Sequence, residues 1–232
     1  MREVDTKDKD RVYIWSLPTR LFHWMFAVSV AVAYFLAETK HWLEIKINHQ
    51  PVAYVAFSLL LFRLLWGFWG PKYSLFKDFK FSKKDAKSFI CNFFKKDKVY
   101  MGHNFLASFN LMGILVVSFI AIIFGFLSFG IEKGKGVLSF MYSSTFKSIG
   151  LFGSIHVFLI NVLLCLVVIH ILGVLSDKII HREYSKIGSI FNGYIVVNDD
   201  SNHDGIKLNF YQRVFAILSF IAIFYFIAHL FL

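Results

Sequence analysis

The uninterrupted apolar run from Leu151 to Ser176 constrains this chain more than any other stretch, because it contains no Asp, Glu, Lys or Arg. A helix rises about 1.5 Å per residue and the hydrocarbon core of a bilayer is about 30 Å thick, so the run is long enough to cross it. Lipid offers no hydrogen-bond partners to an open backbone, and a run of this kind must therefore be helical. The run predicts a transmembrane helix.

Four more apolar runs have the length of a membrane span, and they cover residues 21–37, 51–70, 104–129 and 210–232. Apolar residues make up 57% of the chain, whereas soluble domains contain about 45–50%. The sequence therefore predicts an all-α integral membrane protein, with a four-helix transmembrane core in residues 21–176 and an extra C-terminal transmembrane helix in residues 210–232. Residues 1–20 and 177–209 are expected to be cytoplasmic surface segments.

The lysines and arginines orient the predicted helices. With the N-terminus in the cytoplasm, the inner segments hold nineteen of these residues and the outer loops hold five, and positive charge is typical of the cytoplasmic side. We therefore expect the N-terminus on the cytoplasmic side of the membrane and the C-terminus on the outer side. The net charge of +10 does not indicate nucleic-acid binding, because it lies in loops between apolar runs and not on one face of a soluble fold.

Two histidines of the long run, His156 and His170, are fourteen residues apart, which places them about 21 Å apart along a helix and about 40° around it. An ionisable side chain inside a membrane is a functional candidate by default. The topology puts His170 and His23 together at the inner ends of their helices, and it puts His156 and His49 together at the outer ends. Each pair is expected to hold the iron of one non-covalent b-type haem. The alternative for any single histidine is a hydrogen bond across helices.

Three further polar residues are candidates for contact with the cofactor or a substrate. Arg63 follows His49 by fourteen residues, so it shares the same helix face at the inner level. Its forked guanidinium suits haem propionates, and the alternative is that it snorkels to the lipid headgroups. His103 and Asn104, at the inner mouth of the third run, are candidates for contact with a quinone or a propionate. His41 is the alternative to His49 as the outer ligand.

The remaining conspicuous residues have structural interpretations. His229 in the last run is expected to pack in the core, and the alternative is a contact with the outer haem. Cys91 and Cys165 lie in settings too different for a structural disulfide, and the sequence contains no C-x-x-C-H motif for covalent haem attachment. The tryptophans near the ends of the runs are expected to form the aromatic belt of a membrane protein. They are Trp15, Trp24, Trp42, Trp66 and Trp69.

Several segments carry a family resemblance in their order along the chain. They are VYIWSLPTRLFHW (12–24), RLLWGFWGPKYSLF (63–76), GHN (102–104) and FNGY (191–194), together with His156 and His170 at their spacing. With this ordered set, the chain resembles the bacterial cytochrome b561 superfamily, in particular the cytochrome b subunit of nickel–iron hydrogenases and its stand-alone relatives. The fifth apolar run has no counterpart in the core of that family.

The resemblance implies a four-helix core with two b haems ligated by His23, His49, His156 and His170, which agrees with the pairing by depth. It also implies a place in the bacterial cytoplasmic (inner) membrane, with the C-terminus in the periplasm. There the protein would transfer electrons between the quinone pool, with quinone as the substrate, and a periplasmic redox protein. That partner is either a nickel–iron hydrogenase or a c-type cytochrome. Two other classes stay open. A histidine-based metal or proton transporter would need acidic side chains within the spans, where the apolar runs have none, and a structural membrane anchor of a redox complex would not need the four histidines.

Overall fold

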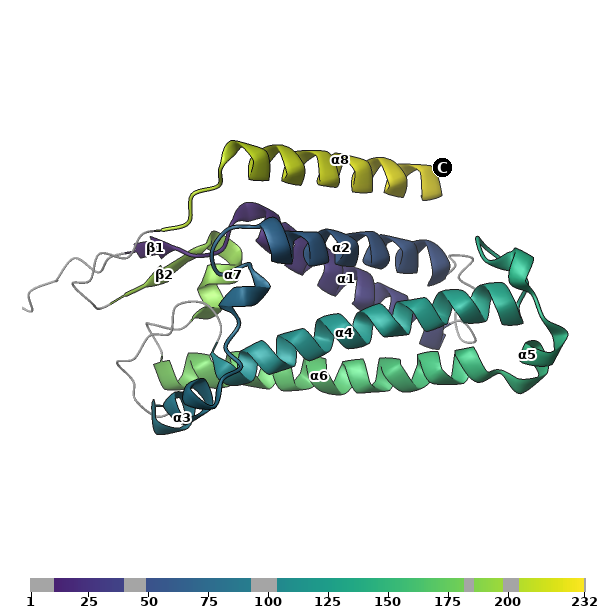
Figure 1. The fold of residues 1–232 in the computed structure, drawn as a ribbon, viewed down its shortest axis with the longest axis horizontal. Coiled ribbons are helices and arrows are strands. Elements are labelled where there is room, and N and C mark those ends of the chain that lie inside the picture. The colour runs from purple at the N-terminus through teal and green to yellow at the C-terminus, as the bar shows by residue number, and fades with distance from the viewer. Residues whose placement is uncertain (1–10, 40–48, 93–103, 182–185, 198–204, 232) are drawn as a thin grey trace, which may run out of the picture. The chain divides into compact units, whose positions relative to one another are not determined.

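The computed structural model describes residues 11–39, 49–92, 104–181, 186–197 and 205–231. Within these residues, five helices are long and apolar enough to cross a membrane (Figure 1), so the prediction of five spans is confirmed. They are α1 (Leu17–Thr39), α2 (His49–Trp69), α4 (Phe105–Leu127) with the π-helical turn η2 (Ser128–Glu132), α6 (Leu151–His181) and α8 (Phe210–Phe231). Contacts divide the chain into a first unit, Met1–Ser108 with Gly173–Leu232, and a second unit, Phe109–Leu172.

In the first unit, α2 packs against both α1 and α8. The ring of Phe62 in α2 lies 6.5 Å from that of Phe22 in α1 and 4.9 Å from that of Phe220 in α8. Trp66, also in α2, is fully buried and donates its indole N–H to the Thr19 hydroxyl at 3.0 Å. Apolar contacts with α1 and α8 therefore bury part of α2, whereas Phe68 and Trp69 at its end stay exposed. The one polar atom of the Trp66 ring has a partner.

Two short strands, which the sequence did not predict, join distant parts of the first unit. Strand β1 (Arg11–Tyr13) pairs antiparallel with β2 (Tyr194–Val196). Gly193, just before β2, has a φ of 92°, and its carbonyl accepts the N–H groups of Ile14 and Trp15 at 2.8 and 3.2 Å. A Cβ at Gly193 would also collide with the Tyr13 ring. Both the backbone conformation and the close approach therefore require glycine here.

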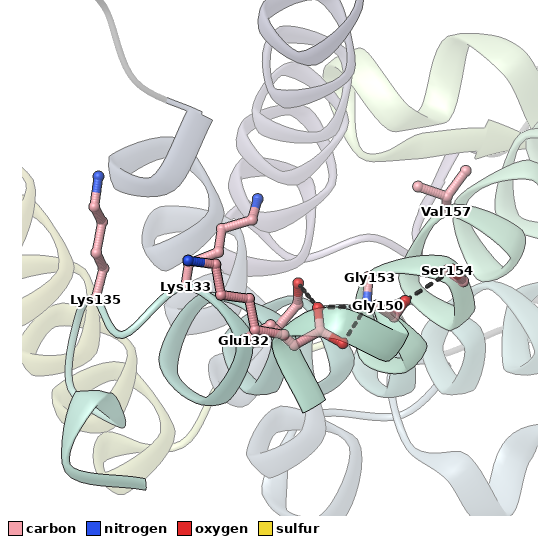
Figure 2. Close-up of a pocket in the computed structure, with 9 residues that line it drawn as sticks. Glu132, Lys133, Lys135, Gly150, Gly153, Ser154 and Val157 are labelled. Atoms are coloured by element: carbon pink, nitrogen blue, oxygen red, sulfur yellow. Dashed lines mark hydrogen bonds between the residues drawn. The ribbon is translucent and has the colours of Figure 1, made fainter. Parts of the chain in front are cut away.

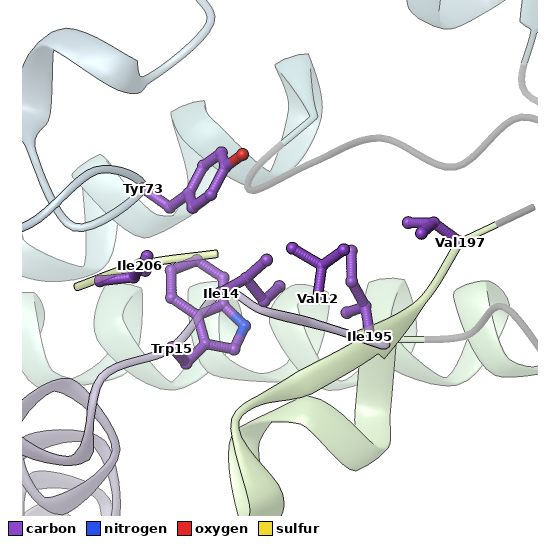
Figure 3. Packing of buried hydrophobic residues seen from close by; sticks show 7 residues of the cluster. All are labelled: Val12, Ile14, Trp15, Tyr73, Ile195, Val197 and Ile206. Carbon is purple, nitrogen blue, oxygen red and sulfur yellow. The ribbon is translucent and has the colours of Figure 1, made fainter. Parts of the chain in front are cut away.

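A small apolar cluster surrounds these strands (Figure 3). Its members are Val12, Ile14, Trp15, Tyr73, Ile195, Val197 and Ile206. The remaining short elements of this unit are η1 (Phe76–Asp78), α3 (Lys83–Asn92), η5 (Lys186–Gly188) and α7 (Ser189–Asn192). The polar segments that flank the membrane helices therefore contain a packed structure of their own, where the sequence suggested only surface.

In the second unit, α4 and α6 lie side by side and antiparallel (Figure 1). Small residues of α4 make the close approach possible: a Cβ built on Gly113 would lie 3.4 Å from the Leu166 side chain, and Ala121 is fully buried. Small residues are typical of membrane helix interfaces, because they let two backbones come close. The connection between the helices contains η3 (Ser139–Met141) and α5 (Ser144–Ile149), which both contact the π-helical turn η2.

Four expectations from the sequence need correction. The third span extends to Glu132, so the spans do contain an acidic side chain, and α6 continues past Ser176 to His181. The expected core packing of His229 is wrong, because this side chain is exposed and stacks on Tyr225. The aromatic belt is only partly right: Trp24 and Trp69 are exposed, but Trp15 and Trp66 are buried. Trp42 lies outside the described residues.

Candidate haem site

His49 is the first residue of α2, and its half-buried ring reaches across to α1. Its Nδ1 atom lies 2.8 Å from the backbone carbonyl oxygen of Ala33. A carbonyl oxygen can only accept a hydrogen bond, so Nδ1 carries the hydrogen and donates it. In the neutral ring, the lone pair that a metal requires is then on Nε2.

His156, on α6 in the second unit, has the same arrangement with a different neighbouring helix. Its Nδ1 donates to the backbone carbonyl oxygen of Ala121 in α4 at 2.7 Å. One turn further along α4 is Gly125, where a Cβ would lie 3.1 Å from both Cε1 and Nδ1 of the imidazole. The absence of a side chain at Gly125 therefore gives the His156 ring its place against α4.

These two hydrogen bonds have the form that metal-binding histidines show in proteins. A ligating imidazole almost always donates its second ring N–H to a carboxylate, a carbonyl or water, which fixes the tautomer and the orientation of the ring. His49 and His156 are the two residues that the sequence assigns to the outer haem. The donor set at both positions therefore fits an iron porphyrin with nitrogen ligands.

The two inner candidates are also half-buried on membrane helices. The His23 ring in α1 packs edge-on against Trp24, with 5.1 Å between ring centroids and an interplanar angle of 89°. Trp24 in turn donates its indole N–H to the carbonyl of Ile190 at 3.4 Å, near the start of α7. His170 lies on α6. His23 and His49 belong to the first unit and His156 and His170 to the second, and the proposed pairing between units stays a prediction.

Arg63 is a strongly buried cation in the second half of α2, about two turns before its end at Trp69. Its side chain is only 6% exposed, and its Cζ atom lies 5.1 Å from the centroid of the Phe76 ring, which follows the helix. Within the described part of the chain, its Nη1 atom is buried and has no hydrogen-bond partner. A buried polar group without a partner is costly, so this guanidinium is suited to an acceptor that the polypeptide does not supply, such as a propionate.

The candidates at the mouth of the third span can be followed only in part, because His103 and His41 lie outside the described residues. Asn104 precedes α4 and caps it: its side-chain oxygen accepts the N–H of Ala107 at 2.8 Å. This is a standard structural role for asparagine at a helix start. The amide nitrogen of Asn104 still offers a donor to a quinone or a propionate, and that contact stays a prediction.

Sequence reasoning missed Glu132, which is buried at the end of the third span. Its carboxylate accepts hydrogen bonds from the Ser128 hydroxyl at 2.7 Å and from the Gly153 N–H at 3.1 Å (Figure 2). It also accepts the N–H of Phe152 at 2.7 Å. It thus caps the start of α6, one turn before His156. The signal was present in the sequence, because Glu132 is the only acidic residue between Asp97 and Asp177.

Other polar groups of interest lie outside the predicted site. Asn110 and Ser118 on α4 are buried, and the side-chain oxygen of each has no hydrogen-bond partner among the described residues. Beyond the end of α6, burial lowers the pKa of Lys186 to about 8, although the nearby Asp177 carboxylate acts in the opposite direction. The part of the chain that the structure describes contains no group of three or more His, Cys, Asp or Glu side chains that could hold a metal ion.

Comparison with known proteins adds one finding to this geometry. The family model described as prokaryotic cytochrome b561 matches residues 14–193, which include the four candidate ligands and Arg63 but end before α8. No curated protein and no solved structure gives a significant match.

Proposed function

Because the chain belongs to the prokaryotic cytochrome b561 family, and is therefore a multi-pass membrane protein that binds haem b and transfers electrons, we propose that it carries two b haems. In this proposal His49 and His156 hold the outer haem, and His23 and His170 hold the inner one. Haem b supplies a reversible one-electron change at its iron when it is bound. The polypeptide supplies the imidazoles, an apolar surrounding and nearby charge, which together set the potential.

The observation that carries the proposal is the matching state of His49 and His156. Each imidazole donates its Nδ1 hydrogen to a main-chain carbonyl of the neighbouring helix, although the two residues are in different units of the chain. If His49 and His156 only joined helices, either ring nitrogen could make the hydrogen bond at each position. A haem ligand that binds iron through Nε2 must instead donate its hydrogen bond from Nδ1.

Arg63 supports a haem at the inner level. Its burial does not suit a side chain that snorkels to the headgroups, because snorkelling keeps the charged end in water. Its Nη1 atom has no acceptor among the described residues, and a propionate would provide one. Guanidinium groups bind carboxylates with two parallel hydrogen bonds, so we assign to Arg63 the orientation and neutralisation of a propionate of the inner haem.

The proposed function is to carry electrons across the cytoplasmic membrane, between quinone on the inner side and a redox protein on the periplasmic side. The distribution of lysine and arginine supports this orientation. His103 and Asn104 are the proposed contacts for a quinone or a propionate, because the predicted topology places both at the inner mouth of the third span. A nickel–iron hydrogenase and a c-type cytochrome are both consistent with the family as the outer partner, and neither direction of electron flow is preferred.

The test is haem content. The purified protein should contain two haems b per chain by the pyridine haemochrome assay, and the substitution His156→Ala should leave one. His229→Ala is the matched control, because His229 is an exposed histidine on a membrane helix that has no place in either pair. Two haems in the His156→Ala variant, or one haem in the control, would contradict the ligand assignment. A colourless protein would instead favour the transporter or the structural anchor.

A further inference from the structure

Three exposed lysines, Lys133, Lys135 and Lys147, line one hollow of about 890 Å³ in the second unit (Figure 2). The hollow lies between the end of η2 and the start of α6, and Val157 of α6 also lines it. We call this feature the outer basic hollow. All three lysines belong to the connection between α4 and α6, which the topology places on the periplasmic side.

The charge of the outer basic hollow is not neutralised from within. Glu132 is the only acidic residue among those that line it, and its two carboxylate oxygens accept the Ser128 hydroxyl and the N–H groups of Phe152 and Gly153. Its charge is therefore directed at the helix start, where the dipole also favours it. The three lysines are exposed, and the carboxylate of Glu132 is already engaged by these three hydrogen bonds.

The position of this hollow matters because of what lies beside it. Val157, which lines it, directly follows the proposed outer ligand His156. The same connection exposes large apolar side chains, with Val137 78% and Phe140 80% exposed. Large apolar side chains that are exposed in the same connection as charged ones mark a surface for interaction. Lysine is also disfavoured on the outer side of a membrane protein by the usual charge distribution, so a cluster of three there calls for a reason.

We propose that the outer basic hollow and the neighbouring apolar side chains are the docking surface for a periplasmic redox partner with an acidic face. This inference rests on the proposed function, because it presumes that electrons leave or enter at the outer haem. Complementary charge acts mainly on the rate of encounter and on the orientation of the partner. The partner is thereby distinguished by its chemistry: it must present carboxylates around its own electron-transfer edge.

Small acceptors of opposite charge provide the first test. Right-side-out membrane vesicles that hold the reduced protein are mixed with impermeant ferricyanide, which is anionic, or with tris(phenanthroline)cobalt(III), which is cationic. Each acceptor takes one electron from ferrous haem, and the loss of the reduced α band is followed by stopped flow. The substitutions Lys133→Gln, Lys135→Gln and Lys147→Gln together should slow ferricyanide about tenfold at low ionic strength and should not slow the cobalt complex. Salt near 1 M should remove the difference, because the screening length is then only about 3 Å.

A matched control removes the same charge elsewhere. Lys77, Lys83 and Lys84 are also exposed, and the topology places them on the inner side. Replacing these three by Gln should leave both rates unchanged within about twofold, because they lie more than a screening length away across the membrane. Equal ferricyanide rates for the native protein and the Lys133/Lys135/Lys147 variant would overturn the inference. The absence of any oxidisable haem band would overturn the proposed function instead.

A second readout does not depend on electron transfer. In phosphatidylcholine vesicles, a decaglutamate peptide should protect Lys133, Lys135 and Lys147 from an impermeant acetylating reagent, as measured by mass spectrometry, whereas decalysine should not. Salt should abolish the protection. If the peptide gives none, and the lysines are instead protected in vesicles of phosphatidylglycerol, they bind lipid phosphate and the docking proposal is wrong. Acetylation that occurs only in inverted vesicles would also refute it.

Discussion

Removal of the Glu132 carboxylate should loosen the start of α6 and disturb the outer haem ligand next to it. In Glu132→Ala, the N–H groups of Phe152 and Gly153 lose their acceptors, which lie 2.7 and 3.1 Å away, and the Ser128 hydroxyl loses its own. A hydrogen bond to a charged group contributes about 1.5–3 kcal/mol. Water can replace part of this at a helix end, where loss of a cap costs about 0.5–2 kcal/mol.

We therefore expect the free energy of local opening at the start of α6 to fall by about 2–3 kcal/mol, which corresponds to an increase of about 30- to 150-fold in amide exchange. Hydrogen exchange with mass spectrometry on peptides that cover Phe152 and Gly153 measures this directly. Glu132→Gln keeps an acceptor oxygen but not the charge, and should lie between the native protein and the alanine variant.

The matched control is Glu38→Ala, which removes an exposed carboxylate near the end of α1, beside the other predicted outer loop. It should leave exchange at the start of α6 unchanged. If Glu132→Ala changes exchange there by less than about threefold, the hydrogen bonds of Glu132 contribute too little to matter. If both variants accelerate exchange equally, the effect is one of net charge, and the capping argument is wrong.

Three further substitutions test the packing and the charge of the molecule. Gly125→Ala should displace the His156 ring, because the new Cβ would lie 3.1 Å from it; we expect a loss of about 1 kcal/mol in stability and an altered spectrum of one haem. Its control is Gly173→Ala, whose Cβ would meet nothing within 4 Å and which should leave stability unchanged or raise it. Trp66→Phe removes a buried hydrogen bond and part of a ring, and should lower the thermal midpoint by an amount that corresponds to about 1–3 kcal/mol; an unchanged midpoint would show that this bond contributes nothing net. Burial lowers the pKa of Lys186 from 10.5 to about 8. Between pH 8 and 10.5 the unfolded chain therefore binds more protons than the folded one, and stability should rise with pH. Lys186→Met should flatten this rise; parallel plots of unfolding free energy against pH for the two proteins would exclude the effect.

The membrane helices could be predicted from the sequence because lipid imposes a simple rule on them. A long apolar run must be helical where water is absent, and this holds for the run around His156 and His170 regardless of what it packs against. The distance between these two histidines along the helix, and the angle between them around it, follow from helix geometry alone. The five spans could therefore be predicted from the sequence, but their ends could not. The third span, for example, continues through a π-helical turn to Glu132.

The polar details could not be predicted in the same way, because they depend on which segments meet. The residues that follow Tyr194 are compatible with a strand, but the partner strand around Tyr13 lies far away along the chain, so the pairing does not follow from the local sequence. Trp66 is near the end of a span, as membrane-belt tryptophans are, but a hydroxyl of a different helix accepts its N–H. The carbonyl partners of the histidines also belong to other helices, so the tautomer of each ring was outside the reach of sequence reasoning.

The pairing of β1 with β2 bears on how the protein is made. Residues 11–13 leave the ribosome before any of the five apolar helices, whereas their partners at 194–196 emerge only after four of these helices have been synthesised. Contacts between such distant segments form late, because a long loop must close before they contribute any stability. The membrane helices must therefore insert before β1 and β2 have paired. A chain cut before Tyr194 would leave β1 as an unpaired edge to which other chains can bind.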